Sequence, residues 1–331
     1  MKNIIYFLVA ISLFSCLKEE EPLARVERGG TQIGGVDIDN NADYANQIYY
    51  DMEKNAVVKT INRTIWDLGF ESTPTGVDII TNTSCKMVVA KTGETDFSAV
   101  TDLGNLTLNY KWDDASGNPD SLALRDWIVG GVPTNEVFVI DRGENPNLGA
   151  RGFKKIKITS VNATEFVIEY ANINGSDYYT KTITKNTDKN FTCFSFDNGG
   201  EVTDVEPDKE DWDLVFTQYL ATFYDFTPQV NYSVNGILIN HKQCKGVKIF
   251  DKEYSDITLS DIASYPVSDS ANAVGYEWKF YDFGEASYVI VPGMNFVIQN
   301  KDGFYYKMRM IDFYSTSGIK GSPRFEFELL Q

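Results

Sequence analysis

The feature that most constrains the fold of this chain is an internal duplication. The element Trp-Asp-Leu-x-Phe occurs at residues 66–70 and again at 212–216, and in each copy an aspartate, Asp51 or Asp197, lies 15 residues before the tryptophan. Further matching elements follow in the same order in both halves. They are Ile80-Thr81-Asn82 with Leu238-Ile239-Asn240, Phe138-Val139-Ile140 with Phe296-Val297-Ile298, the strand at Lys155 with that at Lys307, and the strand at Phe166 with that at Phe325. A shared order of this kind predicts two tandem copies of one unit, at residues 43–186 and 187–331.

Alternating side chains predict that both copies are built from β-strands. Residues 155–159 and 307–310 alternate basic and apolar side chains, and residues 165–170 and 324–329 carry aromatic and aliphatic residues between charged ones. A period of two gives a strand one buried face and one solvated face. Turn signals of the Asn-Gly and Asp-Gly type separate these runs, and long helical periodicity is scarce. The sequence therefore predicts an all-β fold.

The Trp-Asp-Leu-x-Phe element is predicted to anchor a core rather than to hold a ligand. Trp66, Leu68 and Phe70 occupy alternate positions, so we expect them to share one buried strand face, and we expect the same of the second copy. The aspartates between them, Asp67 and Asp213, should face the other way and bond turn backbone near the strand end.

The first residues indicate where the protein is located. A short basic start precedes an uncharged apolar run at residues 4–13, and Cys16 follows Ser15. This is the layout of a signal peptide (1–15) that ends at a lipidated cysteine, because the run is shorter than the ~20 residues of a spanning helix. The acidic segment at 17–22 resembles the signal that sends Bacteroidetes lipoproteins to the outer face of the outer membrane. We predict that residues 16–42, which are polar and Gly-rich, form a flexible tether.

Charge and motif content exclude several functions. The net charge of −17 repels nucleic acid, so no nucleic-acid partner is expected. Cys85, Cys193 and Cys244 have no zinc-site spacing, and their odd number leaves at least one thiol unpaired within the chain. The chain lacks a nucleophile elbow, a phosphate loop, a His-Glu-x-x-His element and a dinucleotide fingerprint, so we predict that it is not an enzyme.

Several motifs together resemble a known family. They are Cys193-Phe194-Ser195-Phe196-Asp197, Trp212-Asp213-Leu214, Phe296-Val297-Ile298 and Asp312-Phe313-Tyr314. This set resembles the HmuY family of Bacteroidetes surface lipoproteins. The resemblance covers most of the second repeat and, more loosely, the first. It implies two HmuY-like β-sheet repeats, a haemophore-like role in iron acquisition, and a TonB-dependent receptor as partner.

The resemblance does not supply the iron ligands. The founding member of the family binds haem through two histidines, whereas this chain has only His241, in a polar segment expected to be a solvent-exposed loop. The remaining candidate ligands are Met294, expected to be accessible in a turn after Pro292-Gly293, and Tyr281. A thioether can ligate haem iron, and a tyrosinate can do so when iron displaces the phenolic proton. The residues alone do not decide among the three.

Aromatic side chains offer a second way to bind a planar ligand. The segment 276–283 aligns with the ligand region of the family and carries five aromatic residues. The candidate binding surface consists of Tyr276, Trp278, Phe280 and Phe283, which could stack on a porphyrin or a sugar. A second aromatic cluster follows the repeat-two anchor at residues 219–226. Ordinary packing of these rings in a β-protein is the alternative.

These observations predict a non-enzymatic lipoprotein on the cell surface, anchored to the outer membrane by a lipid, with haem or a related porphyrin as its first candidate ligand. The alternative is a surface adhesion or glycan-binding module that has the same fold and no haem site.

Overall fold

A computed structural model describes residues 30–38, 44–104 and 106–331 of the chain. The predicted signal peptide, Cys16 and most of the predicted tether lie outside these residues. The described part is built from β-strands with a few short 3₁₀ helices, which confirms the all-β prediction. Within it, no helix is long and apolar enough to cross a membrane.

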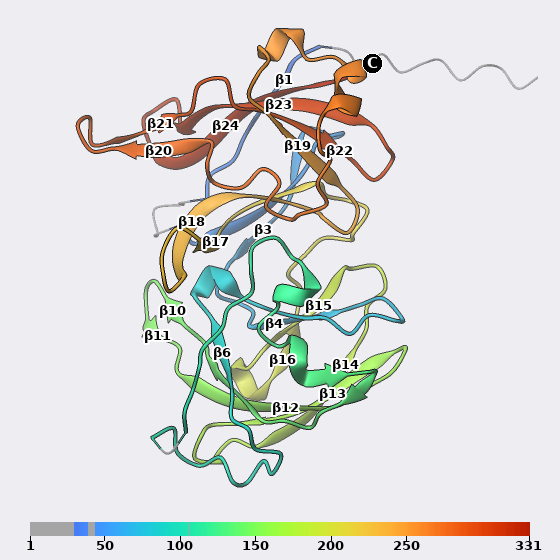
Figure 1. Cartoon of the computed structure of the whole chain (residues 1–331), viewed down its shortest axis with the longest axis vertical. Helices are drawn as coiled ribbons and strands as arrows, with labels where there is room; N and C mark the ends of the chain where they lie inside the picture. The colour runs from blue at the N-terminus through green and yellow to red at the C-terminus, as the bar shows by residue number, and fades with distance from the viewer. Residues whose placement is uncertain (1–29, 39–43, 105) are drawn as a thin grey trace, which may run out of the picture.

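Two sheets form the first lobe, drawn mainly in green in Figure 1. The five-stranded sheet has the order β14-β13-β12-β9-β6, and the four-stranded sheet has the order β16-β15-β4-β5. The bounds are β4 (Leu68–Glu71), β5 (Ile79–Thr81), β6 (Val88–Lys91), β9 (Phe138–Asp141), β12 (Phe153–Val161), β13 (Glu165–Ala171), β14 (Tyr179–Thr184), β15 (Phe191–Ser195) and β16 (Glu201–Thr203). Their facing sides enclose a core that includes Leu68, Phe70 and Phe166.

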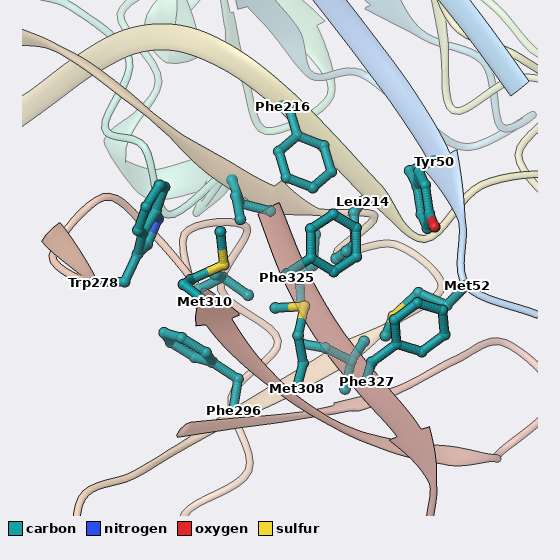
Figure 2. Packing of buried hydrophobic residues seen from close by; sticks show 14 of the residues in the cluster. Tyr50, Met52, Leu214, Phe216, Trp278, Phe296, Met308, Met310, Phe325 and Phe327 are labelled. Atoms are coloured by element: carbon teal, nitrogen blue, oxygen red, sulfur yellow. The ribbon is translucent and has the colours of Figure 1, made fainter. Parts of the chain in front are cut away.

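The second lobe repeats this plan with orders β1-β24-β23-β22-β19 and β18-β17-β2-β3. The bounds are β1 (Gln32–Gly35), β2 (Asn46–Asp51), β3 (Ala56–Asn62), β17 (Leu214–Phe223), β18 (Val230–Ile239), β19 (Lys245–Ile249), β22 (Asn295–Gln299), β23 (Tyr305–Tyr314) and β24 (Lys320–Leu329). Figure 2 shows its core, in which Phe216, Met308 and Phe325 meet between the two sheets. The two lobes are thus matching pairs of sheets, in agreement with the predicted duplication.

Short elements connect the main strands. The small hairpins are β7 (Ile128–Val129) with β8 (Val132–Pro133), β10 (Glu144–Asn145) with β11 (Gly149–Ala150), and β20 (Lys279–Asp282) with β21 (Ser287–Ile290). The 3₁₀ helices are η1 (Thr83–Cys85), η2 (Pro119–Ser121), η3 (Arg125–Trp127), η4 (Asp197–Gly199), η5 (Tyr254–Asp256) and η6 (Leu259–Ser264). In chain order, the hairpin β7–β8 lies between β6 and β9, and the hairpin β20–β21 lies between β19 and β22. The two hairpins therefore occupy equivalent places in the two repeats.

The lobes exchange strands. β2 and β3 begin the first repeat but lie in the second lobe, where β2 pairs with β17; β1, which precedes that repeat, also lies there and pairs with β24. β15 and β16 begin the second repeat but lie in the first lobe, where β15 pairs with β4; β14, at the end of the first repeat, takes the position equivalent to β1. The boundary expected near residue 186 separates the repeats in sequence, but in space it falls inside the first lobe, between β14 and β15.

Part of the predicted tether is a strand of the second lobe. β1 lies within residues 16–42, and the side chains of Val36 and Ile38 just after it are buried in the core. One glycine of this segment, Gly34, serves close packing. At Gly34, a Cβ atom would collide with the ring of Phe325, so only glycine fits between the strands.

The Trp-Asp-Leu-x-Phe elements differ from the expectation in one respect. Leu68 and Phe70 do share a buried face, but Trp66 packs elsewhere, in a cluster that also holds Trp212. The reason is that the strand begins at Leu68, so the alternation does not extend back through Asp67. We name the shared cluster, whose residues lie on or next to strands of the two four-stranded sheets, the interlobe cluster. It consists of Tyr49, Ile61, Trp66, Phe191, Cys193, Val205, Trp212 and Val215.

The aspartates of the element bond backbone as predicted. Asp67 accepts a hydrogen bond from the N–H of Phe196, just after β15, and Asp213 accepts one from Met52, just after β2, each at 2.8 Å. Because they bond equivalent aspartates, Met52 and Phe196 occupy equivalent positions in the two lobes. The sequence motif instead matched Asp51 with Asp197, which differs from the structural alignment by two residues.

Candidate functional site

Six exposed aromatic side chains of the second lobe gather on two neighbouring hairpins, together with three partly buried ones. We name this surface the aromatic face. It consists of Phe223, Tyr224, Phe226 and Tyr232 from the β17–β18 hairpin, Phe280, Tyr281, Phe283 and Tyr288 from the β20–β21 hairpin, and Tyr276 between them. Phe283 at the tip of β20–β21 is 89% exposed, and Phe280 is 51% exposed. An exposed group of this size marks a binding surface more often than an isolated ring does.

The rings of the aromatic face contact one another within each hairpin. Phe223 stacks on Tyr232 at a centroid distance of 5.6 Å and lies 6.2 Å from Tyr276. Tyr281 makes edge contacts with Phe283 at 5.1 Å and with Tyr288 at 5.2 Å. These contacts hold the rings in place, so a planar ligand would meet a surface that is already ordered.

A buried lysine joins the two hairpins. The Nζ of Lys279, the first residue of β20, donates to the carbonyl of Asn235 on β18 at 2.5 Å. The same Nζ lies 4.0 Å from the ring centroid of Trp278 and 4.7 Å from that of Phe313. Burial lowers the pKa of Lys279 to about 7. The base of β20–β21 is thereby fixed to β18, next to which it also lies in Figure 1.

The sequence predicted a binding surface of four aromatic residues, and three of them lie on the aromatic face. Phe280 and Phe283 are exposed, and Tyr276 lies at the edge of the face against Phe223. Trp278 is a correction: it is buried in the core of the second lobe and its indole N–H donates to the carbonyl of Gly275 at 3.1 Å. It lies just before β20 and points into the core, which Figure 2 also shows.

The three candidate iron ligands lie in three different environments. Tyr281 is 40% exposed and belongs to the aromatic face. Met294 is a correction, because it is buried in the core of the second lobe and not accessible in a turn. The turn is made by Pro292 and Gly293, and Met294 is the first side chain to enter the core ahead of β22.

His241 is also placed differently from the exposed loop that was expected. It lines a cavity between the two lobes, and its ring packs so closely on Gly117 that a Cβ there would lie 2.9 Å from Nε2. Burial lowers the pKa of His241 to about 4, so the imidazole is neutral at pH 7. None of the three candidate ligands shares a site with another in the described residues.

Two members of the aromatic face were missed from the sequence. Tyr232 and Tyr288 carry no local signal, because each stands alone among aliphatic and polar residues. Tyr232 joins the face through the register of the β17–β18 hairpin, where it lies opposite Ala221 and near Phe223. A sequence-based prediction of the β17–β18 pairing would have placed Tyr232 next to Phe223.

The described residues offer no cluster of three or more His, Cys, Asp or Glu side chains that could hold a metal ion. Cys85, Cys193 and Cys244 are all free thiols and all buried.

The comparison with protein families decides the membership of this chain. The family model described as HmuY protein matches it twice, over residues 43–195 and 188–327. The chain belongs to the HmuY family. The two matches correspond to the two sequence repeats, so each HmuY match begins with strands that lie in the opposite lobe from most of its later strands.

Two solved structures are among the matches to this chain. The apo HmuY analogue of Tannerella forsythia is 12% identical, with 91% of this chain and 96% of that chain covered and a TM-score of 0.25. Apo PinO from Porphyromonas gingivitis is 9% identical, with 91% and 98% covered and a TM-score of 0.25. No curated protein matches the sequence.

Proposed function

We propose that this HmuY-family protein is a non-enzymatic ligand-binding protein whose aromatic face binds a planar conjugated molecule, with haem or a related porphyrin as the first candidate. The observation that carries the proposal is the exposed pair of aromatic hairpins. They include the segment 276–283, which the family resemblance aligns with the ligand region. Aromatic rings stack on a porphyrin plane and shield its apolar surface from water.

Tyr281 is the proposed iron ligand. It is the one candidate ligand that lies on the aromatic face, and its ring is already oriented by Phe283 and Tyr288. Tyrosinate is an established axial ligand of haem iron. Met294 could reach a haem only if the core of the second lobe opened, and His241 faces the interlobe cavity.

The cellular role follows from the same proposal. A lipid on Cys16 would hold the protein at the outer face of the outer membrane, where the aromatic face could capture haem for iron acquisition. Transfer to a TonB-dependent receptor would complete that role. The signal-like residues 1–16 and the family membership support this assignment.

Titrating haemin into the purified full-length protein tests the proposal. A saturable shift of the Soret band is expected. Phe283→Ala should weaken binding up to about tenfold through lost stacking. Tyr281→Phe should change the spectrum, because the iron loses its phenolate. Val132→Ala is the matched control: Val132 is 67% exposed on β7–β8, the equivalent hairpin of the first repeat.

Two results would contradict the haem assignment. One is a non-saturable absorbance change in the wild-type protein, and the other is equal loss of binding in the Val132 control. If haemin fails and soluble glycans compete with a fluorescent dye for the aromatic face, the glycan-binding alternative is favoured. Exposed hydroxyl-bearing rings such as Tyr232 would serve that alternative.

A further inference from the structure

A segment of the first repeat, residues 111–116, reaches from the first lobe to the aromatic face, and we name it the bridging segment. Its beginning is fixed to the first lobe. Lys111 pairs with Val89 on β6 through two backbone hydrogen bonds, each of 2.8 Å. The buried carboxylate of Asp113 accepts the backbone N–H of Thr81 on β5 at 2.6 Å. The bridging segment is thereby attached to both sheets of the first lobe.

The side chains on either side of Asp113 bond to the second lobe. The indole of Trp112 donates to Oγ1 of Thr222 on β17 at 3.0 Å. The carboxylate of Asp114 accepts the hydroxyl of Thr222 at 3.1 Å and that of Tyr224, just after β17, at 2.6 Å. Successive side chains of an extended chain point to opposite sides. Asp113 can therefore bond the first lobe while its two neighbours bond the second.

The contact with the second lobe continues beyond Asp114. Ala115 packs on the small cluster formed by Tyr219, Ala221 and Val234, against which Tyr276 of the aromatic face also packs. The carbonyl of the next residue in the chain accepts a backbone N–H from residue 271 of the second repeat at 2.7 Å. The bridging segment is thus held on both lobes, and this fixes the position of its carboxylate relative to β17.

Tyr224 is held differently from its neighbours on the aromatic face. Phe223 stacks on Tyr232, and Tyr281 makes edge contacts within its own hairpin. The ring of Tyr224 is 64% exposed, and its hydroxyl donates to Asp114. This hydrogen bond raises the pKa of Tyr224, because the nearby carboxylate disfavours the phenolate. A charged acceptor makes the bond stronger than a neutral one would, so a residue of the first repeat sets the direction of this ring.

The arrangement exists in one direction only. The bridge of Lys111 to β6 has its counterpart in the bridge of Ser268 to β19. At the same distance after the bridge, the second repeat has Ala271 where the first has Asp114, so it has no carboxylate to offer. The first lobe also has no long hairpin to receive one, because β17 has 10 residues and its counterpart β4 has 4. The second repeat carries the aromatic face, and the first supplies a carboxylate to it.

We propose that Asp114 is a positioning residue of the ligand site: it orients Tyr224 and the end of β17, so that the first repeat completes a site that the second repeat carries. This inference rests on the proposed function of the aromatic face. A ring that is held before binding loses less conformational freedom when the ligand arrives. Asp114 therefore increases the affinity for a planar ligand without touching it.

Fluorine NMR of the full-length protein labelled with 3-fluorotyrosine tests the contact without a ligand. The signal of Tyr224, assigned with Tyr224→Phe, should titrate at lower pH in Asp114→Asn, because the neutral amide no longer disfavours the phenolate. Asp120→Asn is the matched control and should leave this midpoint unchanged, since Asp120 pairs with Arg125 at 2.9 Å. A role of Asp114 in folding alone would lower the melting temperature and leave the Tyr224 midpoint in place.

Haemin titration measures the effect of the same contact on binding. Asp114→Ala and Tyr224→Phe should each weaken binding by about three- to tenfold. The double variant should bind no more weakly than the weaker single variant, because both substitutions remove one contact. Asp120→Ala should bind like the wild-type protein. Tyr224→Phe leaves the bridging segment intact, so it reports on the contact even if Asp114→Ala fails to fold.

The two measurements separate this inference from the proposed function. If haemin does not bind the wild-type protein, the proposed function fails, and the fluorine titration still decides whether Asp114 positions Tyr224. The inference is overturned if Asp114→Asn leaves the Tyr224 midpoint unchanged. It is also overturned if haemin binds the wild-type protein and both single variants equally well, or if the losses in the double variant are additive.

Discussion

The carboxylate of Asp213 accepts the backbone N–H of Met52 at 2.8 Å, across 161 residues of chain. Asp67 holds Phe196 in the same way in the other lobe. Each aspartate thus fastens a hairpin that comes from the other repeat. The surroundings differ, however. Asp67 also pairs with Arg142 at 2.9 Å and with Arg151 at 3.0 Å, whereas no ion pair among the described residues includes Asp213.

This difference predicts unequal effects of one substitution at equivalent sites. Asp67→Asn breaks a buried ion-pair network and should lower the free energy of unfolding by about 3–5 kcal/mol. Asp213→Asn should cost about 1 kcal/mol or less, because asparagine keeps the acceptor for Met52 and burial already raises the pKa of Asp213 to about 6. Urea denaturation at pH 7 measures both, and equal losses would contradict the assignment of Asp67 to the stronger network.

The strand exchange predicts which fragments fold. Residues 43–186 lack β15 and β16, so they should not unfold cooperatively when expressed alone. Residues 64–206 contain every strand of the first lobe and should show a cooperative thermal transition by circular dichroism. A cooperative 43–186 fragment with native spectra would show that the exchanged strands are dispensable.

Glu206 predicts a pH dependence of stability. Burial raises its pKa from 4.5 to about 7, so the folded state keeps a proton that the unfolded chain loses. The free energy of unfolding should therefore fall as pH rises from about 4.5 to about 7 and stay level above. Glu206→Gln should remove this part of the dependence and raise stability at pH 8 by about 1–3 kcal/mol.

The exposed Glu94 supplies the control for that prediction. Glu94→Gln should leave the stability profile unchanged, since its side chain is solvated in the folded state. Urea midpoints between pH 4 and 8 measure both variants. A Glu206→Gln protein with the wild-type slope would refute the assignment of the pH dependence to this carboxyl.

The placement of Met294 and His241 predicts that neither holds haem iron. Met294→Leu and His241→Gln should leave the Soret spectrum and the haemin affinity as in the wild-type protein, because both side chains lie away from the aromatic face. A variant that keeps its thermal stability but loses the Soret shift would identify the substituted residue as a ligand.

Cys16 gives a prediction about location. Cys16→Ala should release the protein from the membrane fraction, because a lipid attached to that thiol is the proposed anchor. Cys85→Ala, a substitution at a buried thiol, should leave fractionation unchanged. Equal membrane retention of the wild-type and Cys16→Ala proteins would exclude the anchor.

Much of the architecture could be predicted from local pattern. Alternation revealed the strands at residues 155–159 and 324–329, and the repeated Trp-Asp-Leu-x-Phe element revealed the duplication. It also indicated that Asp67 and Asp213 bond backbone near the strand end, although not that Asp67 pairs with Arg142 and Arg151. These features depend on residues near one another in sequence.

The candidate sites could be predicted less well. Tyr281, Phe280 and Phe283 were found because they form a dense aromatic run, but Trp278 in the same run is buried and Tyr232 joins from another hairpin. Exposure of a ring depends on what the opposite sheet covers, and no local pattern records that.

By itself, the sequence determined the strand content, the duplication and the family, because side-chain alternation and repeated motifs are properties of short segments. Only the tertiary structure decided that β1–β3 belong to the second lobe, that Trp66 meets Trp212 in the interlobe cluster, and that His241 faces a cavity. The physical reason is that the alternation within a strand determines which of its side chains share a face. Which other strand it pairs with depends on the free energy of the whole packed structure. Two copies of one unit offer equivalent partners, and the sequence pattern does not distinguish between them.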